Sequence, residues 1–123
     1  MKTALKPYTI LYAEDDMALQ KSTAEYLRRY FKEVHLASDG TEALNLYDTC
    51  QADVVILDID MPYLDGLSVA NQIRKRDQNI PIVMMTAFTD TQMLLEATEL
   101  NLTTYLVKPV KASQFQEALQ KYV

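Results

Sequence analysis

Residues 54–66, VVILDIDMPYLDG, are the stretch from which the fold is inferred most directly. They begin with an apolar run, which is typical of a strand that is buried on both faces of a sheet. The run ends in two carboxylates, Asp58 and Asp60, and Pro62 and Gly66 then indicate a turn. Because burying an unpaired carboxylate costs free energy, acids at this position suggest that their charge is used.

Four further segments have the composition of buried strands, and amphipathic segments separate them. The order is βαβαβαβαβα, which predicts an α/β fold with a parallel sheet covered by helices on both faces. The predicted strands are residues 8–13, 33–37, 52–58, 80–87 and 103–108.

Apolar stripes with helical spacing mark the segments between and after the strands. Two helix starts are also predicted from capping pairs, Asp39 with Glu42 and Ser113 with Gln116. The stripes are Leu19, Tyr26, Leu27 and Tyr30; Ala43, Leu44 and Tyr47; Val69 and Ile73; Met93, Leu94, Ala97 and Leu100; and Phe115, Ala118, Leu119 and Tyr122.

The composition indicates one folded domain, and we expect residues 1–123 to form it with its core in residues 8–122. The chain is 49% hydrophobic and 24% charged, which argues against disorder. No apolar run approaches the roughly 20 residues of a membrane-spanning helix, and no signal peptide is recognisable. The single cysteine excludes an internal disulfide, so we expect a cytoplasmic domain. The formal net charge of −5 argues against direct nucleic-acid binding by this segment.

Polar residues follow four of the predicted strands. Because the carboxyl ends of parallel strands meet at one edge of a sheet, we expect these side chains to converge. Two carboxylates about 4 Å apart repel by roughly 4 kcal/mol, a large share of a domain stability of roughly 5–15 kcal/mol. The residues are Glu14, Asp15 and Asp16 after the first strand, Asp58 and Asp60 at the third, Thr86 at the fourth and Lys108 at the fifth.

A divalent cation would relieve this repulsion, because one lysine cannot balance three or more acids. A ligand set made only of oxygens, with no histidine or cysteine nearby, suits Mg²⁺ better than Zn²⁺. A carboxylate beside Mg²⁺ and a lysine can attack phosphorus and form an aspartyl phosphate. Asp16, taken alone, fits a simple helix cap equally well.

Four motifs in this order, ILYAEDD, VVILDIDMPYLDG, MMTA and YLVKP, resemble the receiver domain of bacterial two-component response regulators. The resemblance covers residues 8–122. It implies a doubly wound, flavodoxin-like (CheY-like) sheet of five parallel strands in the order 2-1-3-4-5 with five helices. It also implies that a sensor histidine kinase donates the phosphoryl group. The domain would then catalyse only its own phosphorylation and dephosphorylation, and would otherwise be no enzyme.

The resemblance further implies a role for each residue at the strand ends. Asp58 would be the phosphoacceptor, and Lys108 and Thr86 would contact the phosphoryl group. Thr86 and Tyr105 would form a switch that remodels the face made by the fourth helix, fifth strand and fifth helix. That face would control an output domain or a target protein. The implied Mg²⁺ ligands are Glu14, Asp15, Asp58 and the backbone carbonyl of Asp60.

Two other functions remain open. The DID sequence of residues 58–60 superficially matches the DxD nucleophile motif of haloacid dehalogenase-type phosphatases, although residues 61–62 replace the usual continuation. Alternatively, the chain is a receiver that serves as a phosphorylation-independent docking module. We expect no membrane partner, and the helix that carries Phe115 and Tyr122 could mediate a phosphorylation-dependent homodimer.

Overall fold

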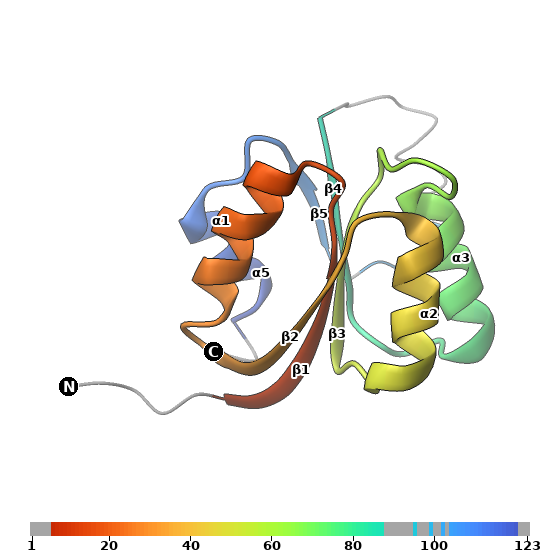
Figure 1. The fold of residues 1–123 in the computed structure, drawn as a ribbon, viewed down its shortest axis with the longest axis horizontal. Helices are drawn as coiled ribbons and strands as arrows, with labels where there is room; N and C mark the ends of the chain where they lie inside the picture. The colour runs from red at the N-terminus through yellow and green to blue at the C-terminus, as the bar shows by residue number, and fades with distance from the viewer. Residues whose placement is uncertain (1–5, 88–94, 96–98, 100–101, 103, 121–123) are drawn as a thin grey trace.

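The computed structural model describes residues 6–87, 95, 99, 102 and 104–120. In this part of the chain, parallel strands form one five-stranded sheet in the order β2-β1-β3-β4-β5 (Figure 1). The predicted α/β fold and strand order are therefore confirmed. The elements are β1 (Lys6–Ala13), α1 (Met17–Leu27), β2 (Phe31–Ala37), α2 (Gly40–Cys50), β3 (Val54–Asp58), α3 (Gly66–Arg76), β4 (Ile82–Thr86), β5 (Thr104–Val107) and α5 (Ala112–Ala118).

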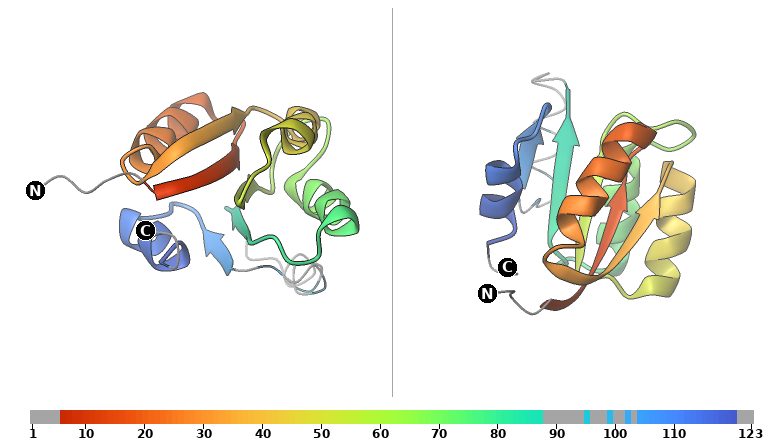
Figure 2. Two further views of the ribbon diagram at one scale, coloured as in Figure 1. Left: turned by 90° about the horizontal axis from the view of Figure 1, so that it is seen from below. Right: turned by 60° about the vertical axis from the view of Figure 1, so that its left-hand side comes forward.

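Helices cover both faces of the sheet, as Figures 1 and 2 show from three directions. In the described part of the chain, α1 and α5 lie on one face, and α2 and α3 lie on the other. Side chains alternate between the faces along each strand, so Tyr12 packs toward α1 and α5 and Leu11 toward α2 and α3. Every residue of β3 and of β4 is buried, which explains their unbroken apolar runs.

Each strand differs from its predicted range by one or two residues at one end or at both, and two of the shifted starts have a clear cause in the structure. β2 begins at Phe31, two residues before the predicted start, because Phe31 continues the buried core. β3 begins at Val54, two residues after the predicted start. The reason is that Asp53 uses its side chain to accept a hydrogen bond from the N–H of Thr9, at 2.8 Å.

Three helices begin at an aspartate whose carboxylate accepts a hydrogen bond from a backbone N–H three residues later, as N-cap residues do. The predicted start at Asp39 is confirmed, although the Glu42 carboxylate reaches the N–H of Ser38 and not that of the cap itself. Asp16 has the cap role that its sequence position allowed. The caps are Asp16, Asp39 and Asp65, and their partners are Leu19 (3.1 Å), Glu42 (2.8 Å) and Ser68 (2.8 Å).

The last helix begins earlier than predicted, so the capping pair of Ser113 and Gln116 is wrong. Its N-cap is Lys111, and the side-chain oxygen of Gln114 accepts a hydrogen bond from the Lys111 N–H at 2.8 Å. Gln114 thus satisfies the N–H of the true N-cap residue, which the predicted start placed before the helix. Of the predicted stripe, Phe115 and Leu119 are buried, Ala118 is half-buried and Tyr122 lies outside the described residues.

The helix predicted from Met93 to Leu100 lies outside the described residues, except for Leu95 and Glu99, which are helical and exposed. The first helix ends at Leu27, so Tyr30 falls in the following turn, where its ring lies 5.2 Å from that of Tyr26. None of the described helices is long and apolar enough to cross a membrane.

Gly66, the first residue of α3, lies against the backbone at the end of β3. Its N–H donates a hydrogen bond to the carbonyl of Ile59 at 2.9 Å. A Cβ at this position would lie 2.2 Å from the carbonyl oxygen of Asp58, which is closer than real contacts allow. Since the φ of Gly66 is not positive, glycine is needed here for space and not for its backbone freedom.

We expect Gly66→Ala to lower the free energy of unfolding by about 1–3 kcal/mol, because α3 or the end of β3 must move to make room. Urea unfolding measures the change. Asn71→Ala, on the exposed side of the same helix, is the control and should alter the stability by no more than about 0.5 kcal/mol. Equal stabilities of the two variants would contradict the close approach.

Candidate functional site

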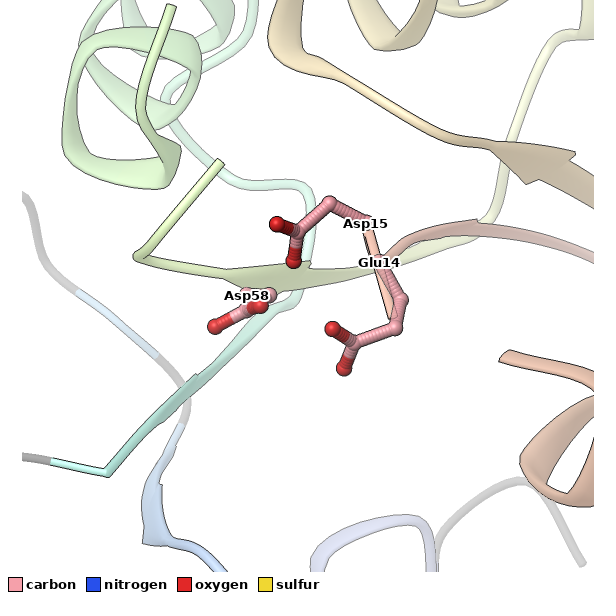
Figure 3. A group of neighbouring side chains, drawn as sticks. All are labelled: Glu14, Asp15 and Asp58. Atoms are coloured by element: carbon pink, nitrogen blue, oxygen red, sulfur yellow. The ribbon is translucent and has the colours of Figure 1, made fainter. Parts of the chain in front are cut away.

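The ends of four adjacent strands carry the predicted site residues. β1 ends one residue before Glu14, β3 ends at Asp58, β4 ends at Thr86, and β5 ends one residue before Lys108. These strands are parallel neighbours, so their carboxyl ends form one edge of the sheet. One oxygen each of Glu14, Asp15 and Asp58 lies within 4.8 Å of the others, and Figure 3 shows the three carboxylates around a common space. The structure therefore brings together three of the five predicted acids, the three whose side chains were the expected Mg²⁺ ligands.

Lys108 bridges two of these acids. Its ammonium nitrogen lies 2.9 Å from Oε1 of Glu14 and 3.0 Å from Oδ2 of Asp58. Glu14 is 0% exposed and Asp58 is 1% exposed, so both carboxylates depend on protein groups to replace water. One ammonium therefore faces two buried carboxylates, and the exposed Asp15 adds a third negative group. The charge at this edge remains negative without a further cation.

Several bonds fix Glu14 in addition to the ion pair. The N–H of Asp16 donates to its Oε2 at 3.2 Å, and the hydroxyl of Tyr12 donates to its Oε1 at 3.4 Å. The side-chain amide of Gln20 donates to the Glu14 carbonyl at 2.9 Å and to the Ala37 carbonyl at 3.1 Å. Burial raises the pKa of Tyr12, so its hydroxyl keeps the proton that it donates. Glu14 is thus held at both its backbone and its side chain.

Sequence reasoning missed Tyr12 and Gln20. An aromatic residue is ordinary within a buried strand, so nothing in the sequence distinguished Tyr12 from its neighbours. Gln20 offered a signal, since it shares a helical stripe with Ala24 and Leu27, both buried. A polar residue on the buried side of a helix needs a hydrogen-bond partner, and backbone carbonyls at the nearby strand ends supply it.

Asp58 is held at both oxygens. Its Oδ1 accepts a hydrogen bond from the N–H of Asp60 at 3.2 Å, and its Oδ2 faces Lys108. Burial raises the pKa of Asp58 to about 7, and the neighbouring Glu14 adds to the rise, whereas Lys108 opposes it. Partial burial and the charge of Asp58 raise the pKa of Asp60 as well. For Lys108, burial favours a lower pKa, but its bonds to Glu14 and Asp58 outweigh burial and raise the pKa.

The donor set fits Mg²⁺. Within the described residues, three carboxylates converge with no histidine or cysteine among them, and hard oxygen ligands are those that Mg²⁺ prefers. Glu14, Asp15 and Asp58 could hold the ion. The backbone N–H of Asp60 donates to Asp58, and the side chain of Asp60 is exposed. The role of the Asp60 carbonyl as a Mg²⁺ ligand stays a prediction.

The two predicted switch residues lie at and near the same edge. Thr86 is fully buried at the end of β4, and its carbonyl accepts a hydrogen bond from the N–H of Lys108 at 2.7 Å. Tyr105 pairs with Met84 across β4 and β5 and is half-buried on the face that α2 and α3 cover. The peptide bond between Lys108 and Pro109 is cis. A movement of Thr86 and Tyr105 stays a prediction.

The raised pKa of Asp58 predicts how the stability of the metal-free protein depends on pH. An aspartate has a pKa near 3.9 in an unfolded chain, so the folded state binds this proton more tightly. The resulting stabilisation is complete below about pH 4 and is lost as the pH rises through about 7. Urea unfolding in EDTA at several pH values measures this, and Asp58→Asn should lose this part of the pH dependence. A pH dependence that is the same in both proteins would contradict the assignment.

Comparison with known protein families matches the chain to a signalling domain. The model of the response regulator receiver domain matches residues 10–120. The chain is 39% identical over 111 residues to the probable transcriptional regulator ycf27 of Guillardia theta, covering 90% of this chain and 43% of that protein. It is 35% identical over 118 residues to the transcriptional regulatory protein PdtaR of Mycobacterium tuberculosis, covering 95% of this chain and 57% of that protein. The chain therefore spans about half the length of these relatives.

A shorter relative and two solved structures match along nearly their whole length. Sporulation initiation phosphotransferase F of Bacillus subtilis is 27% identical over 114 residues, which cover 93% of this chain and 92% of that protein. The Vibrio cholerae chemotaxis protein CheY4 superposes with a TM-score of 0.85 at 27% identity, covering 95% of this chain and 99% of that one. The HemR receiver domain of Leptospira biflexa superposes with a TM-score of 0.84 at 32% identity, covering 94% and 93%.

The match extends over nearly all of the sheet and includes all four strand ends that carry the acidic edge. It favours a signalling receiver over the haloacid dehalogenase-type phosphatase, since receiver domains are generally non-enzymatic signalling modules. The chain belongs to the family of response regulator receiver domains of two-component systems.

Proposed function

We propose that Asp58 accepts a phosphoryl group from the phosphohistidine of a sensor histidine kinase in a Mg²⁺-dependent reaction. The observation that carries this proposal is the pairing of the buried Asp58 carboxylate with Lys108, 3.0 Å away, at the centre of an acidic edge. A carboxylate with only a structural role is rarely buried beside two other acids. A carboxylate that binds a metal ion and acts as a nucleophile is commonly found in such a cluster.

In the reaction, a carboxylate oxygen of Asp58 forms a bond to phosphorus as the phosphorus–nitrogen bond of the donor breaks. The leaving imidazole takes the electron pair of that bond. The ammonium of Lys108 balances negative charge on the transferring group, and the N–H of Asp60 keeps the Asp58 carboxylate oriented. Most of the catalysis is therefore positioning and electrostatic stabilisation.

Glu14, Asp15 and Asp58 are the side chains that would hold Mg²⁺, together with the backbone carbonyl of Asp60. The bound ion would neutralise charge on both the carboxylates and the phosphoryl oxygens. The excess of negative charge that one lysine leaves unbalanced supports this assignment. The structure of a CheX–CheY complex from Borrelia burgdorferi with BeF₃ and Mg²⁺, which is similar to this chain at 25% identity and a TM-score of 0.86, supports it as well.

After phosphorylation, the hydroxyl of Thr86 would bond the phosphoryl group and Tyr105 would turn inward. The carbonyl of Thr86 already contacts the backbone of Lys108, so a shift of one strand end is transmitted to β5. Moving such a two-state equilibrium from mostly off to mostly on needs roughly 5.5 kcal/mol of differential interaction. The charge-assisted hydrogen bonds that a phosphoryl dianion would gain from Lys108 and Thr86 together contribute a free energy of this order. The remodelled face of the fourth helix, β5 and α5 would then act on an output domain or a target protein.

The proposal extends to the domain organisation, the cellular location and the partners of the protein. Residues 1–123 would form one receiver domain that works in the cytoplasm, with a histidine kinase as its phosphodonor. The transcriptional regulators among its relatives favour an output in gene regulation, while the net charge of −5 argues that this segment does not itself bind nucleic acid. A homodimer through the α5 side would form on phosphorylation. Sedimentation with and without beryllofluoride and Mg²⁺ tests that dimer.

The central experiment uses acetyl phosphate with Mg²⁺ and measures the intact mass. One added phosphoryl group per chain, absent when EDTA replaces Mg²⁺, is the expected result. Continuous turnover of an aryl phosphate would favour a phosphatase. A protein that takes up no phosphoryl group and binds neither Mg²⁺ nor beryllofluoride would be a phosphorylation-independent docking module, and the proposal would be wrong.

A further inference from the structure

Tyr12, a buried residue of β1, contacts the acidic edge from the core of the protein. Tyr12 is 0% exposed, and its ring packs in the core between the sheet and α1. Its hydroxyl donates a hydrogen bond to Oε1 of Glu14 at 3.4 Å. A buried hydroxyl needs such a partner, because leaving it without one costs free energy.

The same oxygen of Glu14 has two donors. Its Oε1 accepts from the hydroxyl of Tyr12 and from the ammonium of Lys108, which lies 2.9 Å away and also contacts Asp58. Polar contacts thus run from Tyr12 in β1, through Glu14, to the strand ends of β5 and β3. The orientation of the Glu14 carboxylate decides where Lys108 sits and which oxygen remains for a cation.

We propose that Tyr12 is a positioning residue for the phosphorylation site, and that its hydroxyl holds the Glu14 carboxylate in the orientation that serves both Mg²⁺ and Lys108. This inference rests on the proposed Mg²⁺-dependent function. Partners that orient metal ligands through hydrogen bonds commonly alter metal affinity 10–100-fold when they are removed. The distance of 3.4 Å is long for an O–H···O bond, so the effect here should lie at or below the low end of that range.

Tyr12→Phe is the direct test, because phenylalanine keeps the ring that fills the core and removes only the hydroxyl. We expect the Kd for Mg²⁺, measured by calorimetry at fixed pH, to rise about 3–10-fold, at or below the low end expected for such partners. The carboxyl ¹³C resonance of Glu14 in the metal-free protein should move as well. Acetyl phosphate labelling should require more Mg²⁺ to reach half its maximal rate.

Tyr26→Phe is the matched control. The hydroxyl of Tyr26, in α1, donates to the carbonyl of Ala112 at 3.3 Å, but Ala112 belongs to α5 and not to the acidic edge. This variant should leave both the Mg²⁺ Kd and the Glu14 resonance unchanged.

The outcomes separate this inference from the function on which it rests. If the wild-type protein binds Mg²⁺ and takes up a phosphoryl group, but Tyr12→Phe has the wild-type Kd and Glu14 resonance, Tyr12 is only a core residue and the inference is wrong. A loss of thermal stability without either change would likewise make Tyr12 a core residue only. If the wild-type protein fails to bind Mg²⁺, the proposed function and this inference both fall.

Discussion

Asp58→Asn should reduce phosphoryl incorporation from acetyl phosphate to the detection limit while leaving the fold intact. The asparagine amide has the size of the carboxylate, and its oxygen can still accept hydrogen bonds from Lys108 or from the N–H of Asp60. It cannot form a stable acyl phosphate, because the amide is a poor nucleophile. Intact mass spectrometry after incubation with Mg²⁺ measures the incorporation.

Asp60→Asn is the matched control for this experiment. Asp60 lies two residues away, is also acidic and is exposed, and its backbone N–H is the group that contacts Asp58. Its variant should still take up one phosphoryl group per chain. A phosphoryl group that persists in Asp58→Asn and disappears in Asp60→Asn would move the acceptor to the neighbouring acid and defeat the assignment.

The same Asp58→Asn protein should be more stable than the wild type at pH 8 in EDTA. Burial raises the pKa of Asp58 to about 7, so above that pH the folded protein holds a carboxylate that its surroundings disfavour. An uncharged amide removes this cost. Thermal or urea unfolding measures the gain, which Mg²⁺ should diminish by stabilising only the wild-type carboxylate.

The convergence of the acids could be predicted from the sequence because it needs only a parallel sheet. Once residues 8–13 and 52–58 are interpreted as buried strands of one parallel sheet, the residues that follow them must lie at one edge. The four motifs at the strand ends then identified the family. In this fold, acidic residues that directly follow apolar parallel strands can only lie together at the carboxyl edge of the sheet.

Other features depend on side-chain geometry that no local pattern contains. Lys108 bridges Glu14 and Asp58, a pairing that residues 94 and 50 positions apart reach only in the folded chain. Nothing in the sequence distinguished Tyr12 from other strand aromatics. Its contact with Glu14, two residues later, depends on both side chains pointing to the same side of the sheet. The start of α5 was misplaced because Gln114, and not Gln116, bonds the N–H of the N-cap residue, which is Lys111 and not Ser113. Such choices depend on packing, which sequence spacing does not specify.

Lys108→Met should lower the free energy of unfolding of the metal-free protein by about 3–5 kcal/mol at pH 8, the range observed when one partner of a buried ion pair is removed. Methionine keeps most of the apolar length of lysine, so the loss reports mainly on charge. The substitution leaves Glu14, which is 0% exposed, and Asp58, which is 1% exposed, facing each other without their shared cation. A loss of this size is a large share of a typical domain stability of roughly 5–15 kcal/mol.

Mg²⁺ and a second substitution distinguish a loss of charge balance from a loss of packing. If the two carboxylates repel each other in Lys108→Met, Mg²⁺ should restore part of the stability, and the double variant Lys108→Met/Asp58→Asn should be more stable than Lys108→Met alone. Lys111→Met, which removes an exposed lysine three residues away, should change stability by no more than about 0.5 kcal/mol. Urea unfolding of the wild type, the two single variants at Lys108 and Asp58 and the double variant, with and without Mg²⁺, gives the coupling energy directly. Equal stabilities of Lys108→Met and Lys111→Met would show that the Lys108 ammonium does not offset the repulsion between the two buried carboxylates.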